Sequence, residues 1–172
     1  MKYIDSTYEI LQFKALNRDV TEVWIDWAID MVSAGFETEH LIILAGISKP
    51  YNQFYLQDLT SKVFNELSLD FSSVKETSFQ YATFLAGEVQ AGRRNQYEVL
   101  QTLKQICLEL DYLKELMDFC LLFWALDDLR YTDQQGYWEG ANRKNIDSII
   151  ASYFERWLLE HPIGEDYTSE SK

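Results

Sequence analysis

Helix-start signals recur along this chain at a fixed spacing, and they restrict its fold more than any other feature. A short polar residue is followed three positions later by glutamate at Ser6, Asp19, Ser73 and Asn95. In this capping box the polar side chain accepts a hydrogen bond from a backbone N–H group, and the glutamate reaches back to the cap. Each of the four residues therefore predicts the beginning of a helix.

Stop signals follow the starts. Gly35, Gly46 and Gly92 each come after a periodic apolar stretch, where glycine can adopt the left-handed conformation that closes a helix. The chain contains only two prolines and seven glycines, so breaks are few. The signals predict eight helices, at residues 7–16, 20–34, 38–45, 53–67, 74–91, 96–111, 113–130 and 143–160.

These helices predict an all-α fold, either a bundle or a stack of helical hairpins. A length of 172 residues suits one domain. We expect a single helical domain over residues 1–162, followed by a polar tail at residues 163–172. The continuous apolar run from Phe119 to Leu126 is too broad for one amphipathic stripe, which predicts a central position for the seventh helix.

The charge of the chain is strongly negative, and both halves of the chain share the excess of acids. It carries 28 acidic and 15 basic residues, a formal net charge of −13. Residues 19–48 contain six acids and no lysine or arginine. Such a surface repels nucleic-acid phosphates and anionic membranes, because both need a cationic footprint. A basic protein partner, or simple solubility, fits better.

The acids of the second predicted helix fall on one narrow face. At about 100° per residue, Glu22, Asp26 and Asp30 lie together. The opposite face is predicted to be core and consists of Val20, Trp24, Ala28 and Met31. Like charges at this spacing repel one another. The acidic face is either a solvated helix surface or a docking surface for a basic protein.

Two further groups are candidate contacts. Asp111, Glu115 and Asp118 have i, i+4, i+7 spacing and are expected at the start of the seventh helix. Tyr137 and Trp138 lie in the longest aperiodic stretch, where they serve either as interface anchors or as a cover for the core.

No catalytic or metal-binding motif is recognisable. The histidines are His40 and His161, and neither forms part of a recognisable nucleophilic triad. No phosphate-binding glycine loop occurs. His40 beside Glu37 and Glu39 is interpreted as a surface residue. We therefore expect no cofactor, no metal and no enzymatic activity.

The cysteines and the N-terminal sequence indicate a reducing compartment. Cys107 and Cys120 stand among apolar residues and are predicted to be buried free thiols. The first residues lack the apolar core of a signal peptide, and no apolar run is long enough to span a bilayer. We expect a cytoplasmic protein.

In size, acidity, aromatic content and lack of catalytic motifs, the chain resembles the small helical immunity proteins that accompany bacterial toxins, as in contact-dependent inhibition and other polymorphic toxin systems. This resemblance implies a cytosolic inhibitor that binds a cognate toxin, often a basic nuclease, and blocks its active site. A helical adaptor or scaffold is the alternative, and an unrecognised enzyme comes third. The sequence leaves the oligomeric state open.

Overall fold

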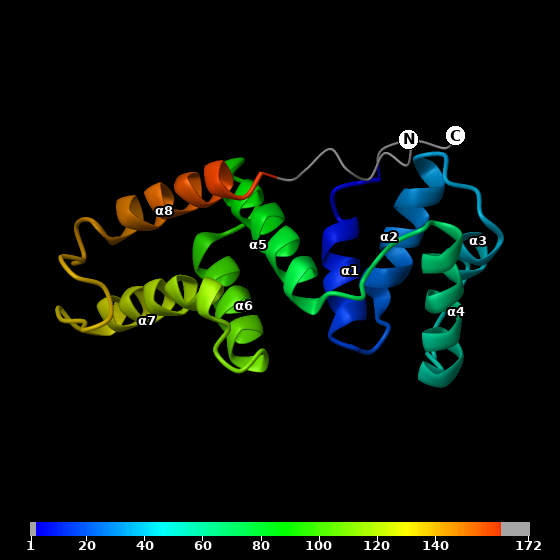
Figure 1. Cartoon of the computed structure of the whole chain (residues 1–172), viewed down its shortest axis with the longest axis horizontal. Helices are drawn as coiled ribbons and strands as arrows, with labels where there is room; N and C mark the ends of the chain where they lie inside the picture. The colour runs from blue at the N-terminus through cyan, green and yellow to red at the C-terminus, as the bar shows by residue number, and fades with distance from the viewer. Residues whose placement is uncertain (1–2, 163–172) are drawn as a thin grey trace. The chain divides into compact units, whose positions relative to one another are not determined.

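The computed structural model of the chain describes residues 3–162, and all regular structure in this range is helical (Figure 1). Eight α-helices and one short 3-10 helix occur there without any strand, which confirms the predicted all-α fold. The elements are α1 (Thr7–Ala15), α2 (Glu22–Ser33), α3 (Glu39–Ala45), α4 (Gln53–Glu66), α5 (Val74–Gln90), α6 (Gln96–Glu109), η1 (Lys114–Leu116), α7 (Met117–Tyr131) and α8 (Ile146–Glu160).

The described chain divides into two compact units, residues 3–81 and residues 82–162. Helix α5 contributes its first half to one unit and its second half to the other. The single helical domain over residues 1–162 stays a prediction. The predicted polar tail at residues 163–172 lies outside the described residues.

The core of the first unit is built on aromatic side chains from α2 and α4. Trp24 is fully buried and stacks on Phe64 at 6.1 Å between ring centroids, and Trp27 meets the same ring edge-on at 6.3 Å. Val20, Ala28 and Met31 are also completely buried, as their positions on the helical wheel predict. Helix α3 packs against both α2 and α4 (Figure 1), and α1 packs on α2 as well. The acidic positions of α2 stay exposed to solvent.

The core of the second unit centres on Phe119 of α7. Its ring contacts three aromatic rings of α8, those of Tyr153, Phe154 and Trp157, at centroid distances of 5.2, 5.8 and 4.9 Å. The Trp157 indole N–H donates to Thr83 Oγ1 at 3.1 Å. Five further residues of the run from Phe119 to Leu126 are buried, which agrees with the predicted central role of this helix.

Two of the four predicted capping boxes form caps, and two do not. Asn95 accepts from backbone N–H groups at the start of α6, and Ser73 accepts from the N–H of Glu76 at 3.2 Å. Ser6 makes no side-chain cap because its own backbone is already helical. Asp19 is not a cap either. The Gln53 side chain bonds both the N–H and the carbonyl of Val20, at 2.8 and 2.9 Å, and α2 begins only after this extended stretch.

Helices end just before all three predicted glycine stops. Gly35 and Gly92 adopt the left-handed conformation, with φ angles of 94° and 71°. Gly46 caps α3 without it, since its φ is −90°. Helix α8 begins at Ile146 rather than at residue 143, since Asn145 and Asn142 form a turn of their own ahead of it.

Candidate functional site

The acidic face of α2, formed by Glu22, Asp26 and Asp30, is solvent-exposed as predicted. Two apolar residues border these acids, Val23 at 43% exposure and Ile29 at 46%. The carboxylates of Asp26 and Asp30 make no hydrogen bond or ion pair with any residue between 3 and 162. We call these five residues the α2 surface. It presents unneutralised carboxylates next to exposed apolar groups.

One end of the α2 surface carries a cation that the sequence pattern does not reveal. Lys49, which follows α3, pairs its Nζ with Glu22 Oε2 at 2.8 Å. The hydrogen bond and the charge of Lys49 lower the pKa of the Glu22 carboxyl. Because Lys49 lies just beyond the base-free stretch, only the folded chain shows that Glu22 is partly neutralised. The unneutralised part of the surface is therefore Asp26 and Asp30.

The second group of acids does not form the predicted helical face. Helix α6 ends at Glu109, and Asp111 has a left-handed backbone with a φ of 53°. Glu115 lies on the 3-10 helix η1, and Asp118 is in the first turn of α7. The i, i+4, i+7 argument assumed one continuous α-helix, which this junction interrupts. The three acids therefore do not share one helical face.

The aperiodic stretch around Tyr137 and Trp138 is a loop whose backbone is held by side-chain hydrogen bonds. A single side-chain amide, that of Gln135, makes four hydrogen bonds within it. Its Oε1 accepts from the backbone N–H groups of Tyr137 and Trp138, both at 2.8 Å, and its Nε2 donates to the carbonyls of Trp138 and Ala141 at 2.7 and 3.0 Å. Arg143 anchors the loop to α7 by donating to the Leu129 carbonyl at 2.7 Å.

The two aromatic residues of this loop divide between the two predicted roles. Trp138 is half-buried and meets Tyr153 of α8 edge-on, at 5.8 Å between centroids. Tyr137 remains 44% exposed and lies against Trp124 at 5.5 Å. Trp138 therefore covers part of the second unit, while Tyr137 is open to a partner.

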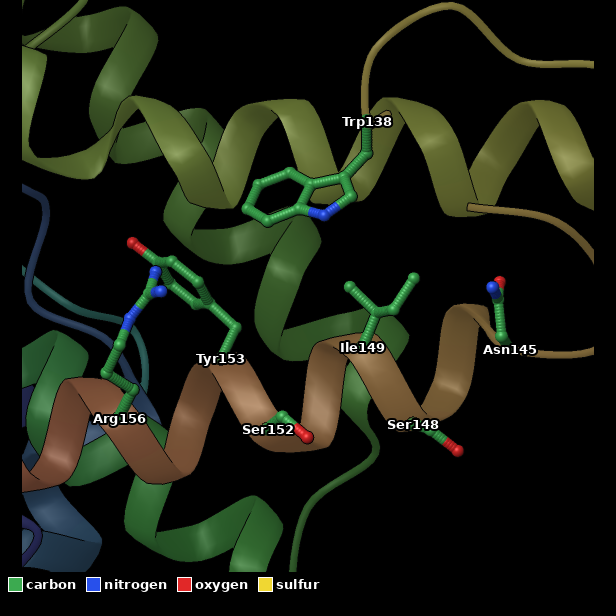
Figure 2. Close-up of a pocket in the computed structure, with 7 residues that line it drawn as sticks. All are labelled: Trp138, Asn145, Ser148, Ile149, Ser152, Tyr153 and Arg156. Atoms are coloured by element: carbon green, nitrogen blue, oxygen red, sulfur yellow. The ribbon is translucent and has the colours of Figure 1, made fainter. Parts of the chain in front are cut away.

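Trp138 and α8 enclose a shallow groove with a volume of about 330 Å³. Figure 2 shows the indole lying over the face of α8 from which Ile149 and Tyr153 project. The groove is lined by Trp138, Asn145, Ser148, Ile149, Ser152, Tyr153 and Arg156. The Arg156 guanidinium lies 5.0 Å from the centre of the Tyr153 ring. This aromatic groove is mainly apolar along its middle and carries one cation at its end.

Two predicted contact residues that are distant in the sequence, Asp118 and Trp138, each lie near Tyr153. Burial, and then the negative charge of Asp118, raise the pKa of the Tyr153 hydroxyl. Trp138 covers the same ring. Sequence reasoning missed Tyr153 and Arg156, because helical periodicity marks Tyr153 only as a core position and Arg156 only as a surface one.

One group among residues 3–162 has the side chains to hold a metal ion, namely Glu39, His40 and Glu66, each with a ligand atom within 4.8 Å of the others. Glu66 is the member that sequence reasoning missed, since it follows His40 by 26 residues.

The buried thiols Cys107 and Cys120 are free, as predicted.

Comparison with known proteins gives no relative. No protein-family model matches the chain, and no curated protein or solved structure is detectably similar to it. Across residues 3–162, every helix is too short or too polar to cross a bilayer.

Proposed function

We propose that this chain is a binding protein that neutralises a basic bacterial toxin, in the manner of an immunity protein, and that it docks through the α2 surface. The observation that carries the proposal is the state of Asp26 and Asp30. Both carboxylates are exposed, and neither has an ion-pair partner among the described residues. A solvated helix face would be expected to mix in lysines, as α4 does with Asp58 and Lys62.

The composition of the α2 surface suits a protein partner. Carboxylates steer a basic partner into place and speed its association, but they contribute little affinity when they stay hydrated. Val23 and Ile29 supply the apolar area that an interface buries at its centre. A nuclease needs a cationic groove to bind phosphates. In the proposed complex, the acids of the α2 surface would occupy that groove in place of the substrate.

The proposal is tested with the protein encoded immediately upstream of this chain, produced with and without it. We expect the pair to form a complex, and the toxin activity to be lost in it. Asp26→Lys and Asp30→Lys, made separately and together, should slow association by about tenfold or more at low salt.

The matched control is Glu155→Lys, a reversal of the same size at an exposed position on α8. It should leave the association rate within about twofold, because it changes the net charge equally but not the α2 surface. Equal slowing by Glu155→Lys and Asp26→Lys would show that net charge alone matters and would contradict the proposed docking surface.

A helical adaptor is the second candidate function, and the aromatic groove on α8 favours it. Trp138, Ile149 and Tyr153 offer apolar contact area for a partner that needs no opposite charge. Binding through this groove would depend weakly on salt and would be weakened by Trp138→Ala. Binding through the α2 surface has the opposite dependence on both.

A further inference from the structure

Three potential metal ligands meet where α3 begins and α4 ends. Glu39 and His40 are the first two residues of α3, and Glu66 is the last residue of α4. His40 Nδ1 lies 2.5 Å from Glu66 Oε1, and the His40 backbone N–H donates to Glu66 Oε2 at 3.1 Å. One ligand atom from each of Glu39, His40 and Glu66 lies within 4.8 Å of the others. We call this group the α3–α4 cluster.

The hydroxyl of Thr38 lies at the same place. Thr38 precedes Glu39, and its Oγ1 is buried without a hydrogen-bond partner of normal geometry among the described residues. It nevertheless lies close enough to the Glu66 carboxylate to act toward it as a hydrogen-bond donor. Buried hydroxyls in native proteins are almost always bonded to protein, water or an ion.

The surroundings favour a cation. Residues 19–48 supply acids and no lysine or arginine, and no lysine or arginine between residues 3 and 162 pairs with Glu39 or Glu66. Helix α4 ends at the cluster, so its negative dipole end adds to the attraction, while the positive end of the short α3 opposes it. With a protein net charge of −13, the balance around the cluster is negative.

We propose that the α3–α4 cluster binds one divalent transition-metal ion of the zinc class, through His40 Nδ1 and the carboxylates of Glu39 and Glu66. Imidazole nitrogen selects zinc, copper, nickel or cobalt ions over magnesium and calcium. Around zinc, ligand atoms at about 2.0–2.2 Å from the ion stand roughly 3.3 Å apart. The side chains are close enough to reach this arrangement when the ion takes the place of the hydrogen shared by His40 and Glu66.

The fourth position of such an ion would be held by water, which three protein ligands leave open. The Thr38 hydroxyl is placed to bond this water or a bound carboxylate oxygen. Outer contacts of this kind orient the ligands of an ion and affect its affinity. The ion would join α3 to α4, so its binding should raise the thermal stability of the folded chain. This inference is independent of the proposed toxin partner.

The experiment titrates the full chain with Zn²⁺ by calorimetry and repeats the titration with Mg²⁺. We expect saturable binding of one zinc ion per chain, a rise in melting temperature with zinc, and no saturable magnesium binding. His40→Gln and Glu66→Gln should each weaken zinc binding by at least about tenfold. Glu37→Gln, an acid two residues before Glu39, and His161→Gln should leave it unchanged.

A measurement on the unaltered chain guards against variants that fold poorly. Because the chain has two histidines, NMR signals of their ring nitrogens are easily assigned. Zinc should shift the His40 signals and leave those of His161 in place. Absence of saturable zinc binding, equal shifts of both histidines, or undiminished binding in both His40→Gln and Glu66→Gln would overturn the proposal.

Discussion

Several single residues determine local structure and surface charge more than their place in the sequence indicates. Lys49 neutralises one end of the α2 surface, and Glu66 completes a three-ligand cluster with Glu39 and His40. Gln135 holds four backbone groups of the loop before α8. Each acts on residues that are distant or irregularly spaced in the sequence, so no helical periodicity identifies it.

The two cysteines give a prediction about alkaline pH. Burial raises the pKa of both the Cys107 and Cys120 thiols. The unfolded chain therefore loses these protons first, and each thiol should weaken folding as the pH rises above about 8.5, by at most about 1.4 kcal/mol per pH unit. Denaturant unfolding between pH 8 and pH 10 measures this slope.

The control for the alkaline slope is Cys107→Ala with Cys120→Ala, studied over the same pH range. This variant is less stable at every pH, but its stability should fall less steeply above pH 8.5 than that of the unaltered chain. An identical slope in both proteins would mean that the thiols do not remain protonated in the folded state.

Helix starts differ in whether a side chain caps them: Asn95 caps α6, whereas α1 begins after Ser6 without a side-chain cap. Asn95→Ala removes a side chain that accepts from two backbone N–H groups, so it should cost about 0.5–2 kcal/mol of folding free energy. Ser6→Ala should cost less than about 0.5 kcal/mol, because Ser6 makes no cap bond. Equal losses in the two variants, measured by urea unfolding, would contradict the assignment of caps.

The loop between α7 and α8 depends on the Gln135 amide. Gln135→Ala leaves two N–H groups and two carbonyls without their partner and should cost about 1–2 kcal/mol. The amide hydrogens of Tyr137 and Trp138 should then exchange faster, as mass spectrometry would detect. Gln134→Ala is the control, since that side chain is exposed and makes no hydrogen bond with a described residue. Similar exchange in both variants would mean that Gln135 does not hold the loop.

The elements also show how far sequence reasoning reaches. Helix number and the buried face of α2 follow from periodicity, because both depend on residues three or four positions apart. The break between α6 and α7 lies close to its predicted place, but the seventh helix begins as the 3-10 helix η1 and not as an α-helix at residue 113. The left-handed Asp111 and Tyr112 are not glycines, so the sequence gives no signal for this change of backbone. The aromatic groove was not foreseen either, because Trp138 and Arg156 meet only through the path of the loop.

The net charge of −13 makes the association of this chain with a charged partner depend on ionic strength. Exposed charges are screened over about 10 Å at 0.1 M salt, so a surface of unpaired carboxylates acts on association mainly at low ionic strength. The aromatic groove, by contrast, would keep its affinity as salt rises. The ionic-strength dependence of binding therefore distinguishes the toxin-neutralising function from the adaptor function.

The most direct test of the α2 surface is the association rate constant for the protein encoded upstream, measured from about 10 mM to about 500 mM salt. We expect the rate to fall steeply with salt for the unaltered chain. For the chain carrying both Asp26→Lys and Asp30→Lys, the rate should be lower and should depend much less on salt. A rate that is independent of salt, or the same steep dependence in both proteins, would contradict docking through Asp26 and Asp30.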